Sequence, residues 1–138
     1  MRGKKTILLV DDDIDDLEIF CSALEGIELD AECFTARNGQ DALQKLTSGE
    51  VKPEIIFLDL NMPLMNGKQF LKEIKQKPVL NKIPVIILST SSDPESIDET
   101  KKLGASHFLT KPDKFSEWEK VLSDILLNNR STSLEYSL

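Results

Sequence analysis

Short runs rich in apolar residues recur five times along the chain, and each is followed by a segment whose apolar residues lie three or four positions apart. The runs cover residues 7–10, 31–36, 55–58, 85–88 and 107–109. Aliphatic runs of this length are typical of parallel strands that are buried on both faces. The pattern therefore predicts five strands that alternate with five helices.

The segments after these runs carry the spacing of amphipathic helices. In the first of them Ile14, Leu17, Cys21 and Leu24 recur at steps of three and four residues, which places them on one helical face. Comparable groups occupy residues 42–46, 70–74, 97–103 and 115–126. The group at 97–103 has few apolar members, so we expect a short peripheral helix there, or one with a face left for a partner.

Aspartates precede three of the expected helices. Asp13 stands before the first, Asp93 before the fourth and Asp113 before the fifth. Aspartate in this position can accept hydrogen bonds from the free N–H groups of the first turn. Pro94, directly after Asp93, suits the first position of a helix. We interpret these aspartates as helix caps.

Strands that alternate with helices form a parallel sheet with right-handed crossover connections. One established order for five such strands, 2-1-3-4-5, places the first and third strands side by side. Asp11 and Asp12 follow the first strand, and Asp59 follows the third. In that order the three carboxylates would flank one crevice at the carboxyl edge of the sheet.

The composition narrows the class of protein. A length of 138 residues suits one domain, which we expect over residues 4–127 with a polar tail over 128–138. The basic start is followed by too few apolar residues for a secretory signal, and no run is long enough to span a membrane. We expect a soluble, cytoplasmic protein. The net charge of −7 argues against direct, non-specific binding to nucleic acid.

The two cysteines, Cys21 and Cys33, do not have the spacing of a metal-binding or redox motif. Both stand among apolar residues. Because free cysteines are among the most often buried residues, we expect reduced thiols packed in the core.

Charged residues follow three of the predicted strands. The first strand runs into Asp11 and Asp12, the third into Asp59, and the fifth is followed by Lys111. Two carboxylates about 4 Å apart repel each other by roughly 4 kcal/mol at an effective dielectric near 20, so such a cluster needs a counter-charge. A divalent cation and a lysine supply it, and the combination suits a phosphoryl group. The pattern predicts a phosphoryl-accepting site.

Four motifs, in order, resemble the receiver domain of bacterial two-component response regulators. They cover residues 7–13, 55–67, 83–89 and 104–112, and read ILLVDDD, IIFLDLNMPLMNG, IPVIILS and GASHFLTKP. The resemblance spans about residues 4–127 and implies an α/β, flavodoxin-like receiver fold with helices on both faces of the sheet. The length allows a stand-alone receiver without an output domain.

This resemblance implies the acceptor and the metal ligands. Asp59 is the phosphoacceptor by analogy with the family. Asp11, Asp12 and Asp59 would bind Mg²⁺ or Mn²⁺ through their carboxylates. The backbone carbonyl of Asn61 would complete the protein ligands.

The resemblance also implies roles around the phosphoryl group. Lys111 would pair with its oxygens, and Ser89 would donate a hydroxyl to one of them. Phe108 stands at the position of the family's switch aromatic, which turns inward on phosphorylation, although a simple core position would also explain it. The peptide bond before Pro112 is commonly cis in this family.

The family implies protein partners. A histidine kinase or a histidine phosphotransfer protein would supply the phosphoryl group. A downstream protein would read the surface formed by the fourth helix, the fifth strand and the fifth helix, which could also bind a second copy of the chain. Such a phosphoacceptor promotes only its own phosphorylation and dephosphorylation and is not otherwise an enzyme.

Other classes of protein remain as alternatives. A pseudo-receiver would keep the site and bind proteins without being phosphorylated. A phosphotransferase of the haloacid-dehalogenase type also has an aspartate nucleophile, but it requires a second aspartate two residues later, where this chain has Asn61. A flavin-binding flavodoxin is disfavoured because the first loop is acidic where a phosphate would lie.

Residues close to the expected site carry two further interpretations. Asp13, Asp15 and Asp16 are read as solvated surface, with Asp13 as a cap. Thr90 follows Ser89 where many receivers have a small residue. We hypothesise that its bulk slows phosphotransfer or hydrolysis.

Overall fold

A computed structural model describes residues 5–27, 30–62, 65–91 and 93–127. Residue 4 and the predicted tail over 128–138 lie outside the described residues. The strands are β1 (Lys5–Val10), β2 (Ala31–Ala36), β3 (Ile55–Asp59), β4 (Val85–Ser89) and β5 (His107–Thr110). The helices are α1 (Ile14–Glu25), α2 (Gly39–Thr47), α3 (Gly67–Lys75), α4 (Pro94–Lys102) and α5 (Phe115–Leu126), with a 3₁₀ turn, η1 (Leu80–Lys82).

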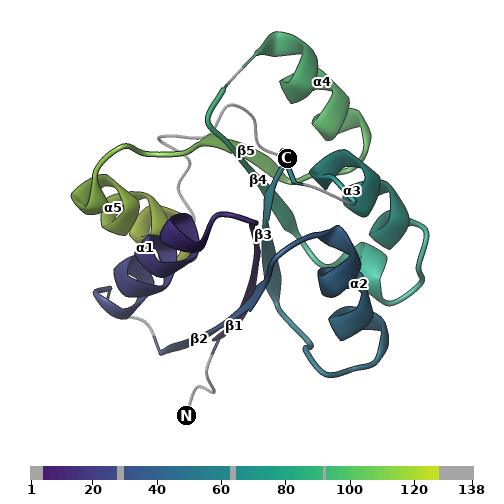
Figure 1. Ribbon diagram of the computed structural model, residues 1–138, viewed down its shortest axis with the longest axis horizontal. Helices are drawn as coiled ribbons and strands as arrows, with labels where there is room; N and C mark the ends of the chain where they lie inside the picture. The colour runs from purple at the N-terminus through teal and green to yellow at the C-terminus, as the bar shows by residue number, and fades with distance from the viewer. Residues whose placement is uncertain (1–4, 28–29, 63–64, 92, 128–138) are drawn as a thin grey trace.

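The strands form one parallel sheet in the order β2-β1-β3-β4-β5. The predicted order 2-1-3-4-5 is confirmed. Helices α1 and α5 cover one face of the sheet, and α2, α3 and α4 lie on the other side (Figure 1). Among the described residues no helix is both long and apolar enough to cross a membrane.

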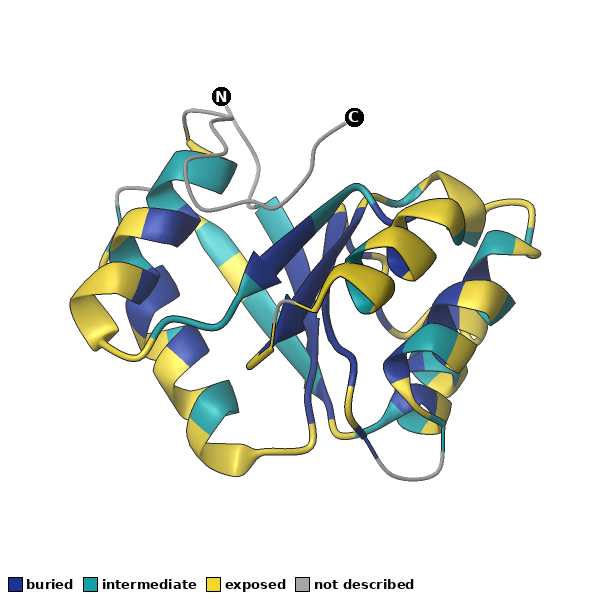
Figure 2. Ribbon diagram, turned by 90° about the horizontal axis from the view of Figure 1, so that it is seen from above, coloured by how far each residue is buried: buried dark blue, intermediate teal, exposed yellow. Residues whose placement is uncertain are grey.

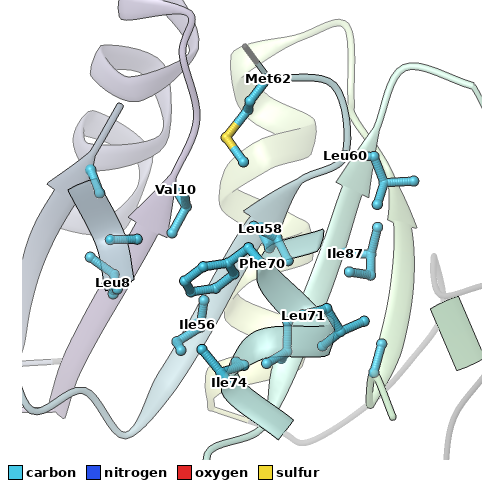
Figure 3. Close-up of a cluster of buried hydrophobic side chains, with 14 of the residues drawn as sticks. Leu8, Val10, Ile56, Leu58, Leu60, Met62, Phe70, Leu71, Ile74 and Ile87 are labelled. Carbon is cyan, nitrogen blue, oxygen red and sulfur yellow. The ribbon is translucent and has the colours of Figure 1, made fainter. Parts of the chain in front are cut away.

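The alternation of side chains along the strands divides the core into two layers. Leu8, Val10, Ile56 and Leu58 face α2 and α3, where Phe70 inserts among them (Figure 3). Their neighbours along β1 and β3 point the other way and pack with α1 and α5. Burying one such side chain fully stabilises the fold by about 1.5–3 kcal/mol. Strands β3 and β4 are accordingly buried throughout between two helical layers whose outer surfaces are exposed, whereas the edge strand β2 is mostly half-buried (Figure 2).

Two of the three predicted caps are confirmed. The side chain of Asp13 accepts hydrogen bonds from the first turn of α1, and Asp93 accepts one from the backbone of Ser96 in α4. The prediction for Asp113 is wrong. Helix α5 begins at Phe115, so Lys114 occupies the capping position and makes no capping hydrogen bond with its side chain. Asp113 stands one residue too early to serve.

The prediction that both cysteines are packed core thiols is wrong in part. They are free thiols, but Cys21 and Cys33 are only half-buried, and their Sγ atoms lie 3.1 Å apart. The two cysteines are distant in sequence, and they meet because α1 packs against β2. The sequence pattern alone did not indicate this contact.

Candidate functional site

The register of the sheet brings the predicted acidic residues together. Val10 pairs with Leu58, so Asp11 and Asp59, each the next residue, stand at the same level of neighbouring strands. Both are buried, with exposed fractions of 1% and 5%, whereas Asp12 is exposed. Carboxylate oxygens of the three residues lie within 4.8 Å of one another.

Lys111 supplies the positive charge in this cluster. Ser89 pairs with Thr110 at the end of the β4–β5 ladder, and the backbone N–H of the next residue, Lys111, donates to the carbonyl of Ser89 at 2.8 Å. The Nζ atom of Lys111 lies 2.9 Å from Asp11 Oδ2 and 3.7 Å from Asp59 Oδ1. The lysine therefore joins the end of β5 to the carboxylates of β1 and β3.

Asp16 is the site residue that the sequence interpretation missed. Its Oδ2 atom lies 2.7 Å from Lys111 Nζ, so it is a partner of the lysine and not simply solvated surface. It stands in the first turn of α1, three residues after the cap Asp13. Asp16 follows Asp11 by five residues and stands at the start of the helix after the first strand. That position in the sequence could have indicated that Asp16 lies near the acidic cluster.

The pKa values of Asp59 and Lys111 are both raised in this cluster, although burial acts on them in opposite directions. Burial, followed by the charge of Asp11, raises the pKa of Asp59 to about 7, although Lys111 acts to lower it. Burial also acts to lower the pKa of Lys111, but hydrogen bonds to Asp16 and Asp11 and the charge of Asp59 raise it overall. Lys111 therefore stays positively charged. With a pKa of about 7, the carboxyl of Asp59 is only partly ionised near neutral pH when no metal is bound.

The remaining predicted residues lie around this cluster. Ser89 is buried, and its Oγ accepts a hydrogen bond from the backbone of Ser91 at 3.2 Å. The backbone N–H of Asn61 is 3.5 Å from Asp59 Oδ1. Asp12, Asn61 and Ser89 line an open, mainly polar hollow of about 460 Å³ beside the carboxylates. This hollow has room for a phosphoryl group.

Phe108 is fully buried in β5, within the core layer that faces α2 and α3. Its ring already lies inside the protein, and its role as a switch that responds to phosphorylation stays a prediction. The described residues contain no cis peptide bond, so the expectation of a cis bond between Lys111 and Pro112 is wrong. The isomers of such a bond differ by only about 0.5–1 kcal/mol, which sequence does not resolve.

The acidic residues fit a divalent cation. Asp11, Asp12 and Asp59 offer hard oxygen ligands from a compact group, and the exposed Asp12 leaves one side open to solvent. Mg²⁺ prefers one or two carboxylates together with water and phosphate oxygens. Three carboxylates, those of Asp11, Asp16 and Asp59, share the ammonium group of Lys111, and Asp12 lies beside two of them. A cation would therefore relieve their repulsion.

Comparison with known proteins shows which family and which relatives this chain matches. The family model for the response regulator receiver domain matches residues 7–123. Response regulator Rcp1 of Synechocystis sp. is 34% identical over 126 residues, which cover 88% of this chain and 86% of Rcp1. A protein-glutamate methylesterase/protein-glutamine glutaminase of Clostridium acetobutylicum is 36% identical over 125 residues, which cover 89% of this chain but 35% of that longer protein.

Solved structures agree with these sequence matches. The phosphorylated cyanobacterial phytochrome response regulator RcpA has a TM-score of 0.84 and 30% identity, with 97% of this chain and 100% of that chain covered. The Mn²⁺-bound form of Rcp1 has a TM-score of 0.79 and 31% identity, with 96% and 99% covered. These matches support phosphorelay signalling, and they do not favour the alternatives of a pseudo-receiver or a dehalogenase-type enzyme.

Proposed function

The chain belongs to the response regulator receiver domain family, and we propose that it accepts a phosphoryl group on Asp59 from a histidine kinase or a histidine phosphotransfer protein. Receiver domains accept phosphoryl groups from histidine kinases and signal to downstream targets. The chain is similar to stand-alone response regulators over nearly its full length, and phosphorelay signalling is its function. The residue assignments that follow belong to the proposal.

The contact of Lys111 with Asp11 and Asp59 carries the proposal. It joins one ammonium group to the buried carboxylate of Asp59, and the next two residues, Leu60 and Asn61, line an open hollow. A surface carboxylate would not need this arrangement. A nucleophile that must receive a phosphoryl group needs a positive charge nearby, because three negatively charged oxygens arrive with the phosphorus.

The transfer itself requires little covalent chemistry from the protein. An oxygen of the Asp59 carboxylate attacks phosphorus, and the bond from phosphorus to the donor's histidine nitrogen breaks. The electron pair of that bond leaves with the imidazole. Lys111 faces the phosphoryl oxygens as a fixed positive charge, and the Ser89 hydroxyl donates a hydrogen bond to one of them.

We assign the metal site to Asp11, Asp12 and Asp59, with the backbone carbonyl of Asn61. The acidic cluster suits a divalent cation, and the structure of Rcp1 with Mn²⁺ supports the assignment by similarity. Mg²⁺ is the ion we propose, with Mn²⁺ as a substitute. When bound, such an ion neutralises charge on the phosphoryl oxygens.

Exposed apolar side chains next to the site suit a protein donor. Ile14 and Ile19 of α1 and Phe115 of α5 are large, exposed hydrophobic residues, and Ile19 and Phe115 line a hollow that also contains Asp16 and Lys111. Helices α1 and α5 pack against each other. Their ends therefore offer an apolar contact beside the acceptor.

The signal would leave through α4, β5 and α5. Phosphorylation would shift an existing equilibrium, with Ser89 drawn to the phosphoryl group and the buried position of Phe108 stabilised. The surface then binds a downstream protein or a second copy of the chain. We place this receiver domain at residues 4–127, followed by the tail over 128–138. We propose no enzymatic activity beyond the turnover of its own phosphoryl group, no binding to nucleic acid and a cytoplasmic location.

Intact mass measurement tests the acceptor. The protein is incubated with acetyl phosphate and Mg²⁺, alongside Asp59→Asn. We expect one phosphoryl adduct on the wild type, none on the variant and none when EDTA replaces Mg²⁺. An adduct on both proteins would place the acceptor elsewhere. No adduct on the wild type, with acetyl phosphate or with candidate kinases, would favour the pseudo-receiver.

A further inference from the structure

Two thiols face each other on the side of the sheet that α1 covers. Cys21 lies in α1 and Cys33 in β2, and their Sγ atoms are 3.1 Å apart. We propose that this pair is an oxidation site, where a peroxide converts the two thiols into an intramolecular disulfide that ties α1 to β2.

The geometry requires only a small movement. The sulfurs in a disulfide are about 2.05 Å apart, so the two Sγ atoms must approach by roughly 1 Å. Helix α1 already packs against β2. Both cysteines are half-buried, which leaves a small oxidant access to them while holding them in place. A closing movement of this size lies within the reach of side-chain rotation.

The surroundings make the two thiols unequal. The hydrogen bond with Cys33 lowers the pKa of the Cys21 thiol, and this effect outweighs burial and the charge of Glu25, which both act to raise it. The same hydrogen bond, together with burial, raises the pKa of Cys33. Because the thiolate is the reactive form, Cys21 reacts first and Cys33 resolves the product.

The reaction with hydrogen peroxide balances in two steps. The Cys21 thiolate attacks one peroxide oxygen, the O–O bond breaks, and the departing hydroxide takes up a proton to become water, leaving a sulfenic acid on Cys21. The sulfur of Cys33 then attacks the sulfur of Cys21, the S–S bond forms, and the hydroxyl group of the sulfenic acid leaves as water. Two thiols lose two electrons, and one peroxide is reduced.

The pair is separate from the acidic site. Cys33 pairs with Ile7 across the sheet, four residues before Asp11 and therefore about 13 Å away along a strand at 3.3 Å per residue. The proposal does not depend on the phosphorylation of Asp59. Oxidised protein should accept a phosphoryl group from acetyl phosphate to the same extent as reduced protein.

Thiol counting tests the oxidation. The full chain is treated with hydrogen peroxide, then denatured, alkylated with N-ethylmaleimide and weighed by mass spectrometry. We expect the monomer to lose two hydrogen atoms and resist alkylation, and dithiothreitol to restore both alkylation sites. Cys21→Ser and Cys33→Ser are the controls, and neither should show that loss. Wild type that keeps both alkylatable thiols, forms disulfides only between chains, or gains oxygen on each cysteine separately would overturn the proposal.

Thermal unfolding gives a second measurement that needs no variant. A cross-link between α1 and β2 restricts the unfolded chain, so the oxidised monomer should melt roughly 5 °C above the reduced one. Dithiothreitol should reverse the increase. An unchanged or lower melting temperature in protein that carries the disulfide would show that the bond does not tie native α1 to native β2.

Discussion

Burial gives the carboxyl of Asp59 properties that an exposed aspartate lacks. It is 5% exposed and lies near Asp11, and both effects raise its pKa to about 7. In the unfolded chain its pKa returns to about 3.9. The native protein therefore binds this proton more tightly than the unfolded chain does between about pH 4 and pH 7, so native stability falls as the pH rises through that window.

Replacing Asp59 with a neutral residue should remove this loss of stability at high pH. In EDTA, Asp59→Asn should be more stable than the wild type by about 1–2 kcal/mol at pH 8, well below the full conversion of the pKa shift because the site is partly screened. Below pH 4 the advantage should vanish, since the wild-type carboxyl is then protonated in both states. Urea unfolding at several pH values measures it. An advantage that does not change with pH would contradict the raised pKa.

Asp16 contributes by holding Lys111. Asp16→Asn removes one charged partner of the lysine at 2.7 Å and should slow phosphorylation by roughly fivefold, the equivalent of about 1 kcal/mol for a partly exposed ion pair. Asp15→Asn is the matched control, because Asp15 is the exposed neighbour in the same helical turn. Rates of acetyl phosphate labelling compare the two. Equal effects would assign the loss to the helix terminus and not to Lys111.

Thr90 lies beside Asp16 and Lys111. It is exposed and lines a hollow with these two residues, and we hypothesise that its bulk narrows the approach to Asp59. We expect Thr90→Ala to gain and lose the phosphoryl group several-fold faster than the wild type. Timed mass spectra after addition and removal of donor measure both rates, and identical rates would reject the hypothesis.

At the scale of elements, the sequence pattern predicted features that depend on nearby residues, such as strands and helix caps. The strand at 55–58 was recognisable because a strand buried on both faces is apolar throughout, and Asp93 marked α4 by its own capping hydrogen bond. The contact of Cys21 with Cys33 and the use of Asp16 were not recognisable. Each depends on how α1 packs against the sheet, which helical spacing alone does not specify.

The start of α3 shows how an element positions Asp59, the proposed acceptor. A Cβ atom on Gly67 would lie 2.5 Å from the carbonyl oxygen of Asp59 and 2.7 Å from the Cα of Leu60. The backbone of Gly67 also donates to the carbonyl of Leu60 at 3.0 Å. Glycine therefore allows the chain after β3 to return tightly against the acceptor.

Adding one methyl group at this contact should displace the acceptor segment. Gly67→Ala should lower the free energy of unfolding by about 1–3 kcal/mol, because neither backbone can yield freely, and should reduce phosphorylation. Asn66→Ala, one residue earlier, removes the cap of α3, at a cost of about 1 kcal/mol, without a clash at Asp59, and should reduce phosphorylation less than Gly67→Ala. Urea unfolding and acetyl phosphate labelling separate the two effects. Normal labelling of Gly67→Ala would contradict the positioning role.

At the scale of the whole molecule, the parallel sheet assembles a site from distant parts of the chain. Asp11, Asp59 and Lys111 belong to different strand ends, and Asp16 comes from the helix that follows β1. Their contacts exist only when β1, β3 and β5 are in register and α1 is packed. The fold thereby joins the edge proposed for phosphoryl transfer to α4, β5 and α5, the surface proposed for partners.

Locating the phosphoryl group tests the central claim most directly. Protein labelled with acetyl phosphate and Mg²⁺ is treated with sodium borohydride, which reduces an aspartyl phosphate to homoserine, and is then digested and sequenced by mass spectrometry. We predict homoserine at position 59, and none there in unlabelled protein. Homoserine at Asp11, Asp12 or any other aspartate, with Asp59 unchanged, would contradict the account.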